Sequence, residues 1–80
     1  MKKIYKYGPV STEYDCTVEG RIVHVGMQGH DVYVWAEQGE NIPPSIVKFV
    51  PTGIPYEGEY VGTVIERGNS FSFVWHVIRQ

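Results

Sequence analysis

The stretch RIVHVGMQGHDVYVWAEQ, residues 21–38, decides the fold of this chain. Its two halves, Arg21–Met27 and Val32–Gln38, are rich in β-branched and aromatic residues and alternate with a period of two, as strands do. Between them, QGHD places Gly29 where a tight turn requires a positive φ. The stretch therefore predicts an antiparallel hairpin, which we expect at the centre of the fold.

Segments on both sides of this hairpin show the same alternation and are separated by turns that contain glycine or proline. They predict five further strands: Lys3–Tyr7, Glu13–Glu19, Ile46–Val50, Tyr60–Glu66 and Phe71–Ile78. Gly8-Pro9 is expected to end the first of these strands. Residues Ser11–Tyr14 are compatible with a short turn. No segment longer than about ten residues has an apolar stripe of helical period. The pattern predicts an all-β protein, a small antiparallel sandwich or open barrel of about six to seven short strands.

The last predicted strand, FSFVWHVI, is apolar on both faces. Phe73 and Trp75 lie on one face and Val74, His76 and Ile78 on the other, so the clean alternation of a half-exposed strand is missing. Either a closed barrel or another copy of the chain would cover the second face, and symmetric dimers are the common solution. We predict a homo-oligomer whose interface includes Val74, Trp75, His76 and Ile78. The core is expected to contain Ile22 or Val23, Val25, Val34, Trp35, Phe49, Val64, Phe73 and Trp75.

Length and composition narrow the class of protein. Eighty residues predict a single domain over residues 1–80, and one cysteine leaves no disulfide framework. No apolar run approaches the roughly 20 residues of a membrane helix, and the start MKKIYKY lacks the apolar segment of a signal peptide. We therefore expect a soluble intracellular protein with no membrane partner. Seven Lys and Arg against nine Asp and Glu give a net charge of −2, so duplex DNA is not an expected partner.

Several side chains have the chemistry of metal sites or catalysis, but their spacing does not favour either. The candidate metal ligands are His24, His30, His76 and Cys16, none of which has the close spacing of a zinc site. Cys16 falls on the apolar face of its predicted strand, which favours a buried inert thiol over a nucleophile. The carboxylate pairs Glu57/Glu59 and Glu37/Glu40 lie in or beside loops, where solvated charge is the usual state. We predict no metal, no cofactor and no enzymatic activity.

Two segments are candidates for binding. In VPTGIPYEG, residues 50–58, the prolines and glycines favour a rigid connector, and the alternative is a recognition loop that exposes Thr52 and Tyr56. In KKIYKY, lysines and tyrosines alternate, and stacking combined with charge is how nucleotides are held. Lys3, Tyr5, Lys6 and Tyr7 are therefore candidate ligand contacts. The favoured alternative is a solvated edge strand whose lysines discourage aggregation.

Five short motifs occur in an order that resembles a known family. They are KKIYKY at the start, IVHVGMQGHDVYVWA in the hairpin, PTGIP in the loop, YVGTV, and FSFVWHV at the end. In this order they resemble a family of small uncharacterised tailed-bacteriophage proteins that open with an Ile-Tyr-Lys-Tyr stretch. Pro51 departs from that pattern, since the family usually has Gly there. The resemblance implies a phage product that acts in the cytoplasm of the infected bacterial host, and it brings no catalytic residues with it.

Functions from different classes fit these observations. A phage accessory protein that binds and inhibits or modulates a host protein, for host takeover or anti-defence, suits the small size and the aromatic content of 14%. A second function is a binder that sequesters a small nucleotide signal between subunits. A minor structural or assembly protein of the virion is the third.

Overall fold

The hairpin that the sequence predicts is present in the structure, a computed structural model that describes residues 1–80. β3 (Arg21–Gln28) and β4 (Asp31–Gln38) pair antiparallel around a turn in which Gly29 has a φ of 64°. The register places Val25 opposite Val34, and both side chains are buried. Alternation holds along β4, where Val32, Val34 and Ala36 are buried, whereas a register shift between Ile22 and His24 brings both Ile22 and Val25 of β3 into the core.

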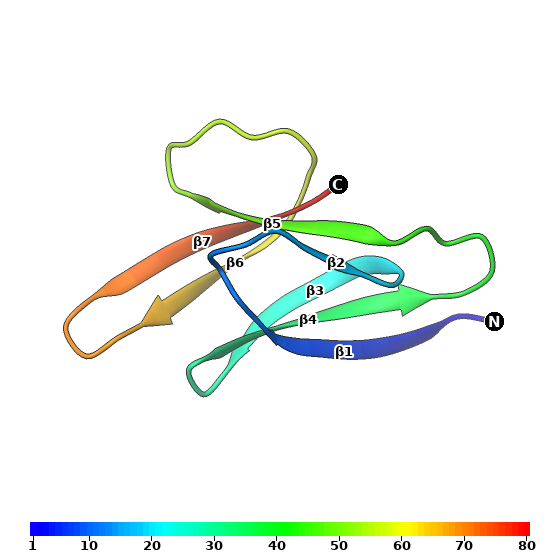
Figure 1. The fold of residues 1–80 in the computed structure, drawn as a ribbon, viewed down its shortest axis with the longest axis horizontal. Helices are drawn as coiled ribbons and strands as arrows, with labels where there is room; N and C mark the ends of the chain where they lie inside the picture. The colour runs from blue at the N-terminus through cyan, green and yellow to red at the C-terminus, as the bar shows by residue number, and fades with distance from the viewer.

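Seven strands form two antiparallel sheets with no helix, which confirms the all-β prediction (Figure 1). The five strands outside the hairpin are β1 (Lys3–Val10), β2 (Cys16–Val18), β5 (Ser45–Pro51), β6 (Glu59–Arg67) and β7 (Ser72–Arg79). One sheet has three strands in the order β1-β4-β3, and the other has four in the order β2-β5-β7-β6. The sheets pack face to face without closing, so the architecture is a small sandwich and not a closed barrel.

Some predicted boundaries and positions were wrong. Glu13–Glu19 was expected to be a strand, but only Cys16–Val18 pairs, because Thr12–Tyr14 forms a turn and the Glu13 amide donates to the Ser11 hydroxyl. The first strand was expected to stop at Gly8-Pro9, but it continues to Val10 with a shift of register. Within its sheet, β4 is central as expected, whereas β3 lies at the edge.

Side chains from both sheets form the core. Nine buried residues cluster there: Val18, Ile22, Val25, Val32, Val34, Ala36, Val47, Val64 and Val77. This confirms the expected Ile22, Val25, Val34 and Val64, and Phe49 and Trp75 pack against the cluster while half-buried.

Two expected core residues lie outside the core. Trp35 lies on the opposite face of β4 from Val34 and Ala36, with its ring 5.1 Å from that of His24. Phe73 is 49% exposed. Its side chain is on the same face of β7 as buried Val77. It is nevertheless exposed, because it lies on a part of β7 that the facing sheet does not reach.

The side chains of Ser45 and Arg79 link the two sheets by hydrogen bonds at the start of β3. The buried Ser45 hydroxyl on β5 donates to the Gly20 carbonyl at 2.6 Å and accepts from the Ile22 amide at 3.3 Å. The Arg79 guanidinium on β7 donates to the Ile22 carbonyl and pairs with Glu59, and only 11% of its side chain is exposed. Gly20 has a φ of 92°, and a Cβ there would lie 2.4 Å from the Glu37 carbonyl oxygen, so only glycine permits this approach.

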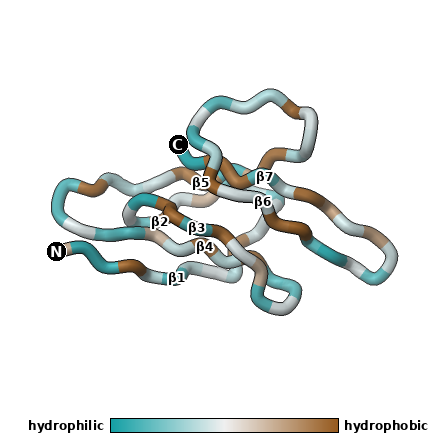
Figure 2. The backbone as a smooth tube through the Cα atoms, turned by 180° about the vertical axis from the view of Figure 1, so that it is seen from behind, coloured by the Kyte–Doolittle hydropathy of each residue, from teal (hydrophilic) through white to brown (hydrophobic).

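The distal part of the β6–β7 hairpin, residues 65–74, projects past the end of the three-stranded sheet (Figure 1). We call this segment the arm. Hydrophobic stretches continue along it in Figure 2, at the right of the view. Burial falls along β7, since Val77 and Ile78 are fully buried whereas Phe71, Phe73 and Val74 are exposed. The structure contains no helix of a length and hydropathy that would cross a membrane.

Candidate functional site

The face of the four-stranded sheet that is turned away from the three-stranded sheet brings several of the predicted site residues together. We call it the outer face. Alternation places Val77 toward the core, so its neighbours His76 and Ile78 point to the outer face. The register sets His76 between Val50 of β5 and Thr63 of β6, at the middle of this face.

His76 is the centre of a hydrogen-bond network on the outer face. Its Nε2 lies 2.8 Å from the Thr52 hydroxyl, and its Nδ1 lies 2.9 Å from the Thr63 hydroxyl. The Tyr60 hydroxyl lies 2.6 Å from Thr63 Oγ1, so four side chains from three segments form one chain of hydrogen bonds. Because hydroxyls both donate and accept, this network fits either tautomer of the imidazole.

The loop from residue 52 to residue 58 arches over this face and is tied to it at both ends (Figure 1). The first tie is the bond from Thr52 to His76, and the second is a bond from the Gln80 side chain to the Glu57 carbonyl at 3.0 Å. Gly58 has a φ of 114°, and a Cβ there would lie 2.8 Å from the Ile78 side chain. The loop is therefore held as a connector, and its side chains are exposed. Recognition through Thr52 and Tyr56 stays a prediction.

Two hollows flank the loop. One of about 440 Å³ lies between the loop and the histidine network, and Ile54, Tyr56, Tyr60 and His76 contribute to its wall. The other, of about 610 Å³, lies on the other side of the loop and includes Lys48, Tyr56 and Gln80. Tyr56, which was predicted for binding, lines both hollows.

The outer face and the loop over it also expose several apolar side chains to solvent. Six large hydrophobic side chains on or over it are exposed: Ile46, Ile54, Tyr56, Tyr60, Ile65 and Val74. The solvent-facing side of an antiparallel sheet is normally polar, so this composition is unusual. Sequence reasoning identified Val74 but missed Tyr60, Thr63 and Ile65, which the pairing of β6 with β7 would have added.

Trp75 does not belong to this face. It points to the inner side of the arm, where Phe71, Phe73 and Trp75 form an aromatic ladder with ring centroids 5.1 and 5.9 Å apart. The Trp75 indole donates to Glu66 at 3.3 Å. The predicted interface residues of β7 are thus divided between two surfaces, and Ile78 is fully buried under the loop end.

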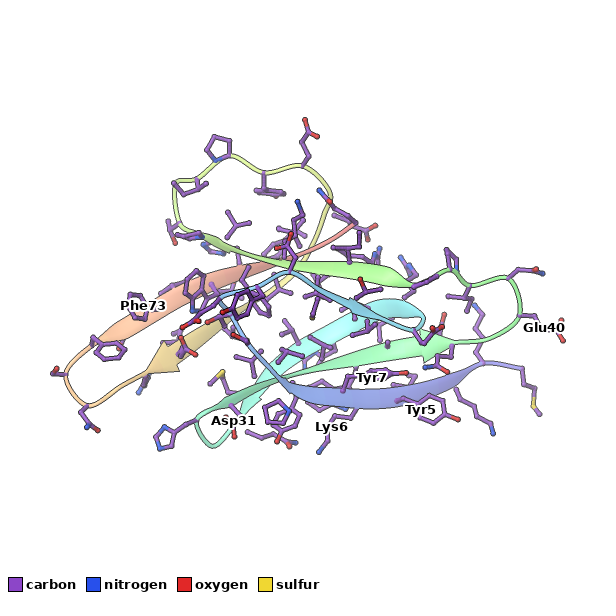
Figure 3. All side chains as sticks on the ribbon, in the orientation of Figure 1. Tyr5, Lys6, Tyr7, Asp31, Glu40 and Phe73 are labelled. Carbon is purple, nitrogen blue, oxygen red and sulfur yellow. The ribbon has the colours of Figure 1, made fainter.

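The N-terminal candidates lie on the other sheet and do not form one site. Tyr5 and Tyr7 share the side of β1 that faces the core, and the Tyr7 hydroxyl accepts from the Gln38 side chain. Lys6 is on the opposite side, where its ammonium lies 4.9 Å from the centre of the Tyr33 ring (Figure 3). Lys3 and Tyr5 line a separate hollow of about 340 Å³.

The remaining titratable candidates are dispersed. No three side chains of His, Cys, Asp or Glu converge. Burial and, to a smaller extent, the neighbouring Asp15 carboxylate raise the pKa of the Cys16 thiol, which is half-buried. The hydrogen bond and charge of Arg79 lower the pKa of Glu59, which pairs with arginines and not with Glu57.

The fold and the outer face together define a small β-sandwich protein in which a loop covers part of one sheet face and exposed apolar side chains lie beside it. A family model matches residues 1–80, and the chain belongs to the family described as domain of unknown function DUF7352. No curated protein and no solved structure matches the chain.

Proposed function

We propose that this protein is a non-enzymatic phage accessory protein that binds and inhibits or modulates a host protein. Its place of action is the cytoplasm of the infected bacterium. The phage context is supported by the order of the five short motifs from KKIYKY to FSFVWHV. The binding function is supported by the outer face of the four-stranded sheet.

The observation that carries this proposal is the apolar surface around the loop. Six large hydrophobic side chains there are each 40–55% exposed. Their summed exposed area comes to roughly a few hundred Å², and polar side chains such as Lys48, Thr63 and His76 lie among them on the same face. Tyrosines at such a surface supply contact area and a hydroxyl for hydrogen bonding, and they are frequent at the centre of protein interfaces.

The histidine network gives this surface a fixed polar centre. His76, Thr52, Thr63 and Tyr60 satisfy one another and hold the loop against β7, so little side-chain freedom remains to be lost on binding. Protein interfaces combine apolar contact area with direct hydrogen bonds, and this face offers groups for both.

The test is capture of the host protein by outer-face variants of a tagged bait from host lysate. Val74→Lys places a charge on the outer face, and Val23→Lys is its matched control, because Val23 is also 40% exposed but lies on β3 of the other sheet. We expect a host protein that the wild type and Val23→Lys retain and that Val74→Lys and Tyr56→Ala lose. Equal retention by all four baits would contradict the proposal that this face binds it.

Sequestration of a small ligand such as a nucleotide is the second candidate, and the hollow of about 610 Å³ beside the loop favours it. Lys48 on its wall supplies a cation for a phosphate, although its ammonium also pairs with Asp15 at 3.7 Å. Mass spectrometry of the supernatant after denaturing the purified protein distinguishes the two functions. A stoichiometric nucleotide that Lys48→Glu fails to retain would favour sequestration.

A further inference from the structure

β1 leaves one long backbone edge of the sandwich unpaired. It is the end strand of the three-stranded sheet and pairs only with β4. None of the backbone hydrogen bonds outside the strand ladders involves residues 3–10. The other edges differ, because β3 packs against β6, where Gly62 meets Val25, and β2 has three residues. β1 is thus a free template for another strand.

Two lysines that form no ion pair lie on opposite sides of this edge. The four ion pairs of the structure leave out Lys3 and Lys6, and Glu37 is held by Lys2 at 3.4 Å. Lys3 shares the side of Tyr5, near Glu19 at the rim of the small hollow, and Lys6 shares the opposite side with Ile4. The Lys6 ammonium donates to the Gln28 side chain at 3.0 Å and lies over the Tyr33 ring, and neither contact neutralises its charge. Ile4 is 61% and Tyr5 45% exposed, so two exposed residues lie between two lysines that form no ion pair.

We propose that the edge of β1 accepts an extended acidic segment of a partner protein as an additional strand. The order Lys-Ile-Tyr-Lys at residues 3–6 determines which residues the added segment needs. Four consecutive residues of that segment should be acidic, apolar, apolar and acidic. In an antiparallel pairing, residues directly opposite share one face of the sheet, so two residues three apart in the segment meet Lys6 and Lys3 on opposite faces. The backbone contributes affinity and these side chains contribute selectivity, as in other cases of strand addition.

The β1 strand of a second copy carries no acidic residue that could meet these lysines. In the antiparallel register that aligns Ile4 with Tyr5 of a second copy, Lys3 of each copy lies opposite Lys6 of the other. Like charges directly opposite destabilise a strand pair. The charge of the edge therefore selects an acidic partner. This surface is separate from the outer face of the four-stranded sheet, and the inference does not depend on the function proposed for that face.

Titration of isotope-labelled protein with blocked synthetic peptides tests the inference, with backbone amide shifts as the readout. The probe is Ser-Thr-Glu-Val-Val-Glu-Thr-Ser. One control has both glutamates replaced by lysine, and the other, Ser-Thr-Val-Glu-Glu-Val-Thr-Ser, has the same composition and charge in another order. We expect the probe to shift the amides of residues 3–7 and to bind at least about tenfold more tightly than the lysine peptide. The reordered peptide should bind a few-fold more weakly, because it meets one lysine at a time.

A charge exchange separates recognition from damage to the fold. The double variant Lys3→Glu/Lys6→Glu should prefer the lysine peptide to the probe. The matched control Lys48→Glu/Arg67→Glu has the same net charge but leaves β1 unchanged, and it should keep the wild-type preference. Three results overturn the inference: no binding of the probe at millimolar concentration, shifts centred outside β1, or an unchanged preference in the β1 variant.

Discussion

Truncation of two residues on the same side of β7 tests whether the arm is unsupported. Phe73 and Val77 share one face of the strand, but Phe73 is 49% exposed and Val77 is fully buried. If the three-stranded sheet ends before it reaches Phe73, the smaller side chain contributes more to stability than the larger one. Alanine at both positions makes the comparison fair, since the loss of strand propensity is similar at the two sites.

The structure sets the expected magnitudes. Complete burial of a phenylalanine side chain contributes up to about 3 kcal/mol, so half-burial predicts a loss of about 1.5 kcal/mol for Phe73→Ala. Val77→Ala removes two buried methyl groups, and the loss of each costs about 0.8 kcal/mol of stability. A void of about 40 Å³ that neighbours do not fill adds about 1 kcal/mol. The expected loss for Val77→Ala is therefore about 2.5 kcal/mol, which reverses the order of side-chain size.

Urea unfolding followed by tryptophan fluorescence measures both losses, and light scattering at the same concentrations reports the mass. The comparison is made at low micromolar protein, where a weak oligomer dissociates, and is repeated at high concentration. If Phe73→Ala costs a monomeric protein as much as Val77→Ala, then the arm is packed within one chain and our description of the sandwich is wrong. A Phe73 loss that grows with concentration would instead show that another copy covers the ladder.

The remaining predictions concern charge, assembly and metal content. Arg79→Met should destabilise the fold by about 2 kcal/mol, because the Ile22 carbonyl loses a charged donor, whereas Arg21→Met, at an exposed ion pair, should cost less than about 1 kcal/mol in the same urea assay. The folded-state pKa of Glu59 lies below its unfolded value, so its contribution is present at neutral pH and is lost as the pH falls through the folded pKa; Glu59→Gln should flatten the acid limb of stability against pH. The homo-oligomer predicted from β7 should give a scattering mass above that of one chain and should dissociate in Val74→Lys; a folded wild type with the mass of one chain would refute it. Untagged protein should contain no zinc by elemental analysis, and near-stoichiometric zinc would contradict the prediction made for His24, His30, His76 and Cys16.

The strands were predictable from the sequence because the alternation of side chains is a local property. The hairpin of β3 and β4 combines a strong period of two with a glycine that takes the positive φ its turn needs. Where prediction failed, nonlocal contacts decided the result. The strand Cys16–Val18 is shorter than the alternating segment Glu13–Glu19 that predicted it, because only three of those residues pair with β5. Trp35 was expected in the core, but its side chain points to the opposite face of β4 from its buried neighbours Val34 and Ala36.

The site was less predictable because its residues come together only through strand order. Thr52, Thr63 and His76 are separated in the sequence, and nothing local indicates that β7 lies between β5 and β6. Once that order is known, the register aligns His76 with Thr63 and places Thr52 within reach.

The apolar character of both faces of β7 has a cause that periodicity cannot show. At Val77 and Ile78 the chain itself covers both faces, through the core on one side and the end of the loop on the other. At Phe73 and Val74 the same pattern continues, but the facing sheet and the loop have both ended. Alternation tells which side of a strand is apolar, whereas the length of the overlap between two sheets tells which part of that side is buried. The exposed arm is therefore a consequence of unequal sheet lengths, and the hydrophobic surface that remains uncovered is where a partner gains the most by binding.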